Sequence, residues 1–413
     1  MTQPSEQLFE RVVRVGNLTV IRADGTSRTF GDRSEPEIIV RFHDWQAQAA
    51  LVRDPVMAMG ELYADGRYTM EKGNIFDLLS LLKRNGSSKV LGPKMVAWSA
   101  ANLLARRIKD TIAGDRAKAN VAHHYDLDAG LFDLFLDKNK QYSCAYYPVG
   151  DEDLDTAQLK KMRHIAAKLM VEPGHSVLDI GCGWGGLAIY LAKACGARVT
   201  GVTLSENQAR EARERVAISG VADLVTILLQ DYREVTGSFD RIVSVGMLEH
   251  VGLANYSTFF RSLYDRLVRV GGIALVHSIG DTRPRRRNNP WMEKYIFPGT
   301  HVPAVSEVTP HAEKIGLLIK DIEIWPIHYA KTLRDWRTRF MMRRIEAEQL
   351  YDARFVRLWE FYLAAMETSF RHDRLFVFQM QLARHQDAVP FSRDYIATRE
   401  FRLAAAEKTA GFS

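Results

Sequence analysis

Cysteine is scarce in this chain of 413 residues, and the three cysteines present, Cys144, Cys182 and Cys195, form no CxxC pair. This spacing predicts neither a disulfide framework nor a zinc site, so we expect no bound metal. The N-terminal stretch also lacks the apolar core of a secretory signal, because charged residues such as Glu6 and Arg11 interrupt it. We therefore expect the protein to work in a reducing cytoplasm.

A long apolar run is missing as well. The nearest approach, residues 90–105, contains Gly92, Pro93 and Lys94 and is shorter than the roughly 20 apolar residues that a membrane-spanning helix requires. Its apolar side chains are expected to pack on the protein itself or to lie on a lipid surface. The sequence also shows no internal repeat and no low-complexity tract.

The composition is that of a soluble globular protein, since 46% of the residues are hydrophobic and 26% are charged. A chain of this length buries a substantial core and is expected to divide into two or three domains. The formal net charge of +6 suits nucleic acid, an anionic membrane surface or an acidic substrate. Charge alone does not choose among these three partners.

The order of strand-like and helix-like patterns predicts three regions. Residues 1–85 predict a small α+β domain, and residues 86–120 predict a linker that contains a helix. Within residues 121–413, strand and helix signals alternate up to about residue 330, which is typical of a mostly parallel sheet with helices on both faces. Beyond residue 331, the sequence has helical spacing and predicts helical additions to this α/β domain.

The strands of the predicted parallel sheet are HSVLDIG (175–181), ARVTGVTL (197–204), LVTILLQDY (224–232), FDRIVSVGM (239–247), IALVHSIG (273–280) and IKDIEIW (319–325).

A glycine-rich turn stands between the first of these strands and the helix that follows it. In the stretch VLDIGCGWGGLAIYLA (177–192), Gly181, Gly183 and Gly185 allow a tight turn whose backbone can approach a ligand closely. The same stretch also satisfies GxGxxG, the pattern of dinucleotide-binding dehydrogenases. A dehydrogenase needs an acidic residue at the end of the next strand, whereas Glu206 lies beyond that end.

Polar residues follow two further predicted strands. Asp231 and Tyr232 follow one of them, and Glu249 and His250 follow the strand in DRIVSVGMLEHVG (240–252). A carboxylate beside a buried strand is costly unless it has a partner, so Glu249 is a candidate for a functional site. A DxGxGxG turn followed by such strand ends is the pattern of methyltransferases that use S-adenosylmethionine, and we favour that class over a dehydrogenase.

Over residues 123–336 the chain resembles the cyclopropane-fatty-acyl-phospholipid synthases, which are related to the mycolic acid cyclopropane synthases. The matching stretches, beside those quoted above, are HHYDLD (123–128), QYSCAYY (141–147), LDIGCGWGG (178–186), GVTLSENQ (201–208), QDYREV (230–235), YIFPG (295–299) and HYAKTLRDW (328–336). The resemblance implies a Rossmann-like class I methyltransferase domain. The N-terminal unit resembles the extra domain of the bacterial members that act on phospholipids.

The resemblance also implies the ligands and the residues that contact them. For the cofactor S-adenosylmethionine these are Tyr142, Ser143, Gly181, Gly183, Thr203, Leu204, Gln208, Asp231, Tyr232 and Arg233. For a bound bicarbonate ion they are Cys144, Glu249, His277, Ile279 and Tyr329. The ring of Tyr142 either lies near the sulfonium, as a cation–π contact, or packs in the core. His250 is expected to be structural.

The implied reaction transfers a methylene group to a cis double bond of an unsaturated phospholipid acyl chain and forms a cyclopropane ring. Proximity to the activated methyl group starts the reaction, and the resulting carbocation needs a dry pocket. Ring closure needs a general base, either bicarbonate or Glu249 itself. Aromatic side chains of the C-terminal segment either line this pocket or form plain core, namely Trp336, Phe340, Phe355, Trp359 and Phe370.

The expected partners are an unsaturated phospholipid in the bilayer and an anionic membrane surface, with no nucleic acid. The protein is expected to be a homodimer associated peripherally with the inner face of the cell membrane. The basic residues of stretch 282–295 and its tryptophan either face that membrane or form a solvated loop, namely Arg283, Arg285, Arg286, Arg287, Lys294 and Trp291. Two alternatives stay open: a related lipid methyltransferase that makes methyl-branched chains, and a lipid-binding module without catalytic activity.

Overall fold

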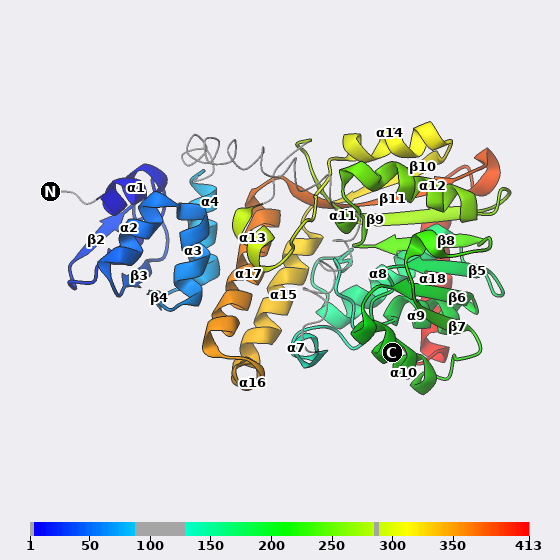
Figure 1. Ribbon diagram of the computed structural model, residues 1–413, viewed down its shortest axis with the longest axis horizontal. Helices are drawn as coiled ribbons and strands as arrows, with labels where there is room; N and C mark the ends of the chain where they lie inside the picture. The colour runs from blue at the N-terminus through cyan, green and yellow to red at the C-terminus, as the bar shows by residue number, and fades with distance from the viewer. Residues whose placement is uncertain (1–3, 87–128, 285–288, 413) are drawn as a thin grey trace. The chain divides into compact units, whose positions relative to one another are not determined.

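The computed structural model describes residues 4–86, 129–284 and 289–412, which form two compact units (Figure 1). One unit holds residues 4–86, 289–298 and 333–374, and the other holds residues 129–284, 299–332 and 375–412. Residues 87–120 of the predicted linker, the HHYDLD motif and the arginines at 285–287 lie outside the described residues.

The first unit contains a four-stranded sheet, in the order β2-β1-β3-β4, and helices that pack with it and with one another. Its elements are α1 (Pro4–Val12), β1 (Leu18–Ile21), β2 (Ser27–Phe30), β3 (Ile38–Phe42), α2 (Trp45–Arg53), α3 (Pro55–Ala64), β4 (Tyr68–Lys72), α4 (Ile75–Arg84), α13 (Pro290–Tyr295), α16 (Arg344–Leu350) and α17 (Ala353–His372). Local hydrogen bonds help to set where the helices begin. For example, α4 begins with a capping box between Asn74 and Asp77.

Segments from the second half of the chain complete this first unit. Helix α17 contacts both α3 and α4, and α13 contacts α3. The α15 helix (His328–Met342) crosses from one unit into the other at residue 333. Of the aromatic residues expected to line the acyl pocket or the core, Trp336, Phe340, Trp359 and Phe370 are buried. The domain limits predicted at residues 85 and 120 stay a prediction.

The second unit is built on a seven-stranded sheet in the order β10-β11-β9-β8-β5-β6-β7. Strands β9, β8, β5, β6 and β7 run parallel, and β11 pairs antiparallel with β9 and β10. Its elements are α7 (Ala129–Asp133), α8 (Leu154–Leu169), β5 (Ser176–Ile180), α9 (Gly186–Cys195), β6 (Arg198–Thr203), α10 (Glu206–Ile218), β7 (Val225–Leu229), η1 (Tyr232–Glu234), β8 (Arg241–Val245), α11 (Leu248–Val251), α12 (Tyr256–Arg266), β9 (Ile273–Asp281), α14 (Val305–Ile315), β10 (Leu318–Trp325), β11 (Leu375–Ala383) and α18 (Asp394–Thr409).

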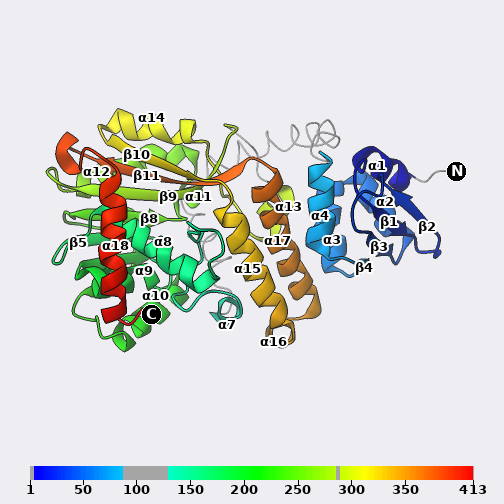
Figure 2. The same cartoon turned by 180° about the vertical axis from the view of Figure 1, so that it is seen from behind.

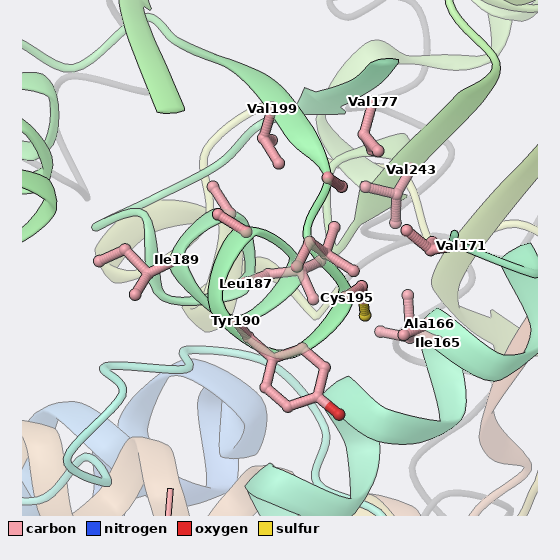
Figure 3. Close-up of a cluster of buried hydrophobic side chains, with 14 of the residues drawn as sticks. Ile165, Ala166, Val171, Val177, Leu187, Ile189, Tyr190, Cys195, Val199 and Val243 are labelled. Carbon is pink, nitrogen blue, oxygen red and sulfur yellow. The ribbon is translucent and has the colours of Figure 1, made fainter. Parts of the chain in front are cut away.

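Helices cover both faces of this sheet, as the alternating pattern predicted. The face toward α8, α9, α10 and α18 holds one apolar cluster, and these helices lie in front of the sheet in Figure 2. Figure 3 shows Leu187 and Cys195 of α9 among side chains of α8 and of the strands, such as Ile165 and Val177. The opposite face packs against α12 and α14. The predicted fold class is confirmed.

The strand β11 corrects the sequence interpretation, which assigned helical spacing to the whole region after residue 331. Its side chains alternate between the two sheet faces: Phe378, Met380 and Leu382 join the cluster under α12, while Gln379 and Gln381 lie between them in sequence. Nearly all of them are buried. A strand covered on both faces does not show the polar alternation that a half-exposed strand shows, and this strand was therefore missed.

Candidate functional site

The glycine turn after β5 has the geometry of a ligand-binding turn. Gly181, Gly183 and Gly185 have φ angles of +81°, +55° and +76°, a region in which a Cβ atom is strained. The backbone N–H groups of Gly181 and Cys182 donate to the carbonyl of Val202 at 2.9 and 3.0 Å, which ties the turn to β6. A Cβ atom at Gly183 would meet no atom of the described residues within 4 Å. The turn therefore leaves open space where a ligand would lie.

The cofactor residues expected after β6 lie together at the start of α10. The Thr203 hydroxyl donates to the side-chain oxygen of Gln208 at 2.9 Å. Ser205 caps α10 by accepting a hydrogen bond from the backbone of Gln208 at 3.3 Å, and half-buried Leu204 lies between them in sequence. The cap explains why the chain turns at this point, at the same edge of the sheet as the glycine turn.

The cofactor residues expected after β7 form a short turn held by an ion pair. Asp231 is buried and caps η1, and its carboxylate accepts a hydrogen bond from the Arg233 guanidinium at 2.7 Å. This bond and the negative charge of Asp231 hold the pKa of Arg233 above its usual value, although burial opposes them. Tyr232 packs edge-on against Phe259, and burial raises the pKa of its phenol to about 12.

The segment 141–147, which carries three predicted site residues, is anchored by α8. The side-chain nitrogen of Gln158 donates to the carbonyls of Gln141 and Ser143, at 3.1 and 2.9 Å. The Lys161 ammonium donates to the Ser143 hydroxyl at 2.7 Å. Tyr142 packs edge-on against two phenylalanines of the preceding segment. The interpretation of Tyr142 as a packing residue is therefore compatible with this geometry, as is a role at the ligand.

The same segment brings Cys144 next to α15, the helix that carries Tyr329. The backbone N–H of Ala145 donates to the Thr332 hydroxyl at 3.0 Å, and that of Tyr147 donates to His328 at 3.0 Å. Tyr329 lies in the first turn of this helix, between these two contacts in the sequence. Burial raises the pKa of the Cys144 thiol far above neutral pH, so the group is a neutral thiol and not a nucleophile.

Glu249 lies on α11, which corrects its expected place at the end of a strand. The strand β8 ends at Val245, and Gly246, with a φ angle of +66°, turns the chain into the short helix. One Glu249 oxygen accepts the backbone N–H of Ile279 at 2.6 Å. The other has no hydrogen-bond partner among the described residues. Burial outweighs these contacts and raises the pKa of Glu249 to about 7.

His277 and Ile279 lie within β9, beside the turn that carries Glu249. The backbone N–H of Gly246 donates to the carbonyl of His277 at 2.8 Å. The His277 ring lies 3.2 Å from the amide nitrogen of Gln379 and packs edge-on against Trp325. Burial lowers the pKa of His277 well below its usual value, with the positive charge of Lys161 adding to this effect, so the imidazole is neutral. Desolvation also lowers the pKa of the neighbouring His250, to about 4.

Three further buried residues lie at this site: two were not identified from the sequence, and Asp179 entered only as the first residue of the DxGxGxG turn. Gln158 and Lys161 are fully buried on α8, and Asp179 is buried on β5. One Asp179 oxygen has no partner among the described residues, and burial raises its pKa to about 7. The signal was present in the helical spacing, because Gln158, Lys161 and Lys168 share the face of α8 that also carries Ile165. Polar side chains on the buried face of a helix indicate that the interior they face is polar.

The site fits polar ligands at the carboxyl edge of the parallel strands. Unpartnered buried oxygens cost free energy unless something occupies them, and the described residues include Asp179, Ser244 and Glu249 among the side chains with such atoms. The turn at Gly183 leaves room for a cofactor. Together they fit a cofactor with polar ends, whereas the bicarbonate ion implied by the family resemblance stays a prediction.

One residue of the basic stretch 282–295, Trp291, does not lie where a membrane-facing role requires it. Trp291 is 1% exposed and packs 4.7 Å from the ring of Phe361 in the core of its unit, so the expectation that it faces a membrane is wrong. Arg283 pairs with Asp281 at 3.0 Å, and Lys294 pairs with Glu61 at 2.7 Å. In the part of the chain that the structure describes, no helix is both long enough and apolar enough to span a bilayer.

The seven-stranded sheet, its glycine turn and the polar groups along one edge define a methyltransferase that uses S-adenosylmethionine. The chain belongs to the mycolic acid cyclopropane synthetase family, whose model matches residues 113–380. It is an enzyme, a cyclopropane fatty acid synthase or a related lipid methyltransferase. The family and the cofactor class inferred from the sequence are thereby confirmed, and the dehydrogenase alternative is excluded.

Two curated relatives illustrate this membership. The chain is 38% identical over 345 residues to the cyclopropane-fatty-acyl-phospholipid synthase of Escherichia coli (strain K12), an alignment covering 81% of this chain and 85% of the relative. It is 36% identical over 403 residues to the tuberculostearic acid methyltransferase UfaA1 of Mycobacterium tuberculosis, covering 92% of this chain and 91% of the relative. Both alignments extend beyond the match to the family model.

Solved structures are also similar to this chain. The mycolic acid cyclopropane synthase CmaA1, crystallised with SAH and CTAB, superimposes with a TM-score of 0.61 at 32% identity, covering 64% of this chain and 97% of that one. Coclaurine N-methyltransferase, at 17% identity and a TM-score of 0.62, shares the fold.

Proposed function

We propose that this enzyme transfers a methylene group from S-adenosylmethionine to a cis double bond of an unsaturated phospholipid acyl chain and forms a cyclopropane fatty acid, with bicarbonate as the general base. The observation that carries the proposal is Glu249. Its carboxylate is buried and oriented by Ile279, and its second oxygen is buried without a hydrogen-bond partner among the described residues. A bound ion would supply that partner. The similarity to the E. coli synthase supports the phospholipid substrate.

The residues of the chain account for the requirements of this reaction. When bound, S-adenosylmethionine supplies an electrophilic methyl group and bicarbonate supplies a base. The turn at Gly183 and the segment that contains Tyr142 and Ser143 would hold the cofactor in line with the double bond. After methyl transfer the acyl chain carries a carbocation, and a proton must leave the added methyl group for the ring to close. Glu249 and neutral His277 would orient the base without attacking the cation.

A methyl-branched product is the second candidate, and one observation favours it. The relative UfaA1, a tuberculostearic acid methyltransferase, aligns over 92% of this chain. The two outcomes share the carbocation and diverge afterwards. Loss of a proton from the added methyl group closes a ring. A hydride shift followed by loss of a proton instead leaves a methylene branch, which a separate hydride donor and a proton would convert into a methyl branch. The choice lies in the placement of the base, which is why Glu249 matters to both.

Lipid analysis tests the proposal directly. The wild-type chain and a Gly183→Val variant would be expressed in a host that contains unsaturated phospholipids but no cyclopropane lipids. We expect wild type alone to add one CH₂ to the acyl chains, with loss of the olefinic proton signals in NMR. A branched saturated chain would instead support the second candidate. Unmodified lipids, from a wild-type protein that binds SAH, would refute both.

The proposal includes peripheral association with an anionic membrane on the cytoplasmic side and a homodimeric state. The net charge of +6 supports the first, because cations near an anionic surface each contribute about 1 kcal/mol. Sedimentation with vesicles should show binding that grows with anionic lipid and falls with salt. Equal binding to neutral vesicles would contradict the electrostatic part, and a monomer in sedimentation velocity would contradict the dimer.

A further inference from the structure

A buried lysine contacts Ser143, a predicted cofactor residue that directly precedes Cys144 in the sequence. Lys161 is fully buried on α8, and its ammonium donates to the Ser143 hydroxyl at 2.7 Å. Lys168, equally buried on the same helix, pairs with Asp321 and Glu323 at 2.9 Å each. Lys161 thus differs from Lys168 in having a neutral hydroxyl, and not a carboxylate, as its hydrogen-bond acceptor among the described residues.

The charges around Lys161 come from several elements packed against α8. Burial lowers the pKa of Lys161 to about 8, opposed by the negative charge of Asp137, by Cys144 and by Asp179. Burial in turn raises the pKa of Asp137 to about 6 and that of Asp179 to about 7. From β9, His277 responds to Lys161 and, less strongly, to Lys168, whose charges help to lower the pKa of its imidazole. Lys161 is therefore electrostatically coupled to both Cys144 and His277.

An anionic base needs a positive charge that its proposed ligands do not supply. Bicarbonate is an anion, whereas Cys144 is a neutral thiol, His277 is a neutral imidazole, and an ionised Glu249 would repel it. Burying an ion without a counter-charge is strongly unfavourable. The five residues implied by the family resemblance therefore leave the charge of the site unbalanced.

We propose that the Lys161 ammonium is the positive charge that retains the anionic base beside Cys144 and His277. This inference rests on the proposed function. The hydrogen bond to Ser143 fixes the ammonium against the segment that also carries Tyr142 and Cys144, so one side chain links the cofactor site to the base site. Lys161 is a positioning residue: it acts through the bound ion, and the chemical step belongs to other groups.

The test measures ion binding separately from turnover. Bicarbonate would be titrated calorimetrically into SAH-loaded wild type, Lys161→Met and the matched control Lys168→Met. We expect Lys161→Met to weaken bicarbonate binding about 10- to 100-fold, as for the loss of a charged hydrogen-bond partner. SAH affinity should fall less than bicarbonate affinity in this variant, because Gln158 still holds the Ser143 carbonyl. The control should bind bicarbonate as wild type does. Wild-type bicarbonate affinity in a folded Lys161→Met protein would overturn the inference.

A second measurement serves if the methionine variant does not fold. At constant bicarbonate concentration, wild-type affinity should fall above about pH 8, where Lys161 loses its proton. Ionisation of Glu249 near pH 7 lowers the affinity of both proteins. Lys161→Arg keeps its charge at all these pH values, so its affinity should lack the further fall above about pH 8. The same fall in Lys161→Arg would refute the role of Lys161 while leaving bicarbonate in place. A wild-type enzyme that binds no bicarbonate and needs none for turnover would refute the proposed base itself, and this inference with it.

Discussion

Substitution of Gly183 by alanine separates cofactor binding from folding. Gly183 has a φ angle of +55°, and its added methyl group would enter space that no described atom occupies within 4 Å. The folded protein therefore accommodates the methyl group, and the cost to stability is the backbone strain of an alanine in this region, about 1–2 kcal/mol. If the cofactor fills that space, the same methyl group overlaps the ligand.

The size of the binding defect follows from that overlap. Forcing one extra carbon into a filled space costs about 1–3 kcal/mol. At about 1.4 kcal/mol per factor of ten, SAH should bind about 5- to 150-fold more weakly to Gly183→Ala than to wild type. Isothermal titration calorimetry measures this difference, and urea unfolding of the same preparations measures stability.

A matched control exists in Gly220, which follows α10. Its φ angle is +69° and a Cβ atom there also meets no described atom within 4 Å, so Gly220→Ala should destabilise the protein by a similar amount. The predicted cofactor residues do not include it, and SAH affinity should stay at the wild-type value. Wild-type SAH affinity in Gly183→Ala, with both variants equally destabilised, would refute the assignment of the turn to the cofactor.

Four further predictions concern three buried residues, Glu249, Gly60 and His164. Glu249→Gln should reduce turnover about 10²- to 10⁴-fold without weakening SAH binding. In an assay free of carbon dioxide, wild type should regain activity when bicarbonate is added. Full wild-type turnover without bicarbonate contradicts this prediction. Because the pKa of Glu249 is raised in the folded protein, the unfolded chain binds fewer protons between about pH 4.5 and 7, and the free energy of unfolding falls as the pH rises. Glu249→Gln should therefore be more stable than wild type by up to about 3 kcal/mol at pH 8 but not at pH 4. Urea unfolding measures this difference. Gly60→Ala should destabilise its unit by about 1–3 kcal/mol in urea, because the new Cβ atom would lie 2.3 Å from the indole nitrogen of Trp291; unchanged stability contradicts this packing. Burial lowers the pKa of His164, but hydrogen bonds to two glutamates outweigh burial and raise the pKa above its usual value. His164→Gln should therefore lose more stability at low pH than at a pH above the raised pKa. A loss of stability that does not depend on pH contradicts this argument.

Local patterns in the sequence determined most of the sheet and its ligand-binding turn. The alternating strands from HSVLDIG to IKDIEIW are present as β5 to β10, because apolar periodicity reports directly on burial. Gly181 and Gly183 identified the turn because their left-handed φ angles depend on the local backbone alone. Residues such as Cys144 and Glu249 came from family resemblance, since no spacing along the chain shows that they meet.

Only the tertiary structure decided what surrounds these groups. β11 inserts antiparallel beside β9 and places Gln379 against His277, although the two residues are 102 positions apart. Lys161 looks like an ordinary surface lysine in the sequence, yet the packing of α8 on the sheet buries its charge next to Ser143. Burial and electrostatic coupling depend on every element that packs around a group, so the sequence determined the backbone of the site and the packed fold determined its charges.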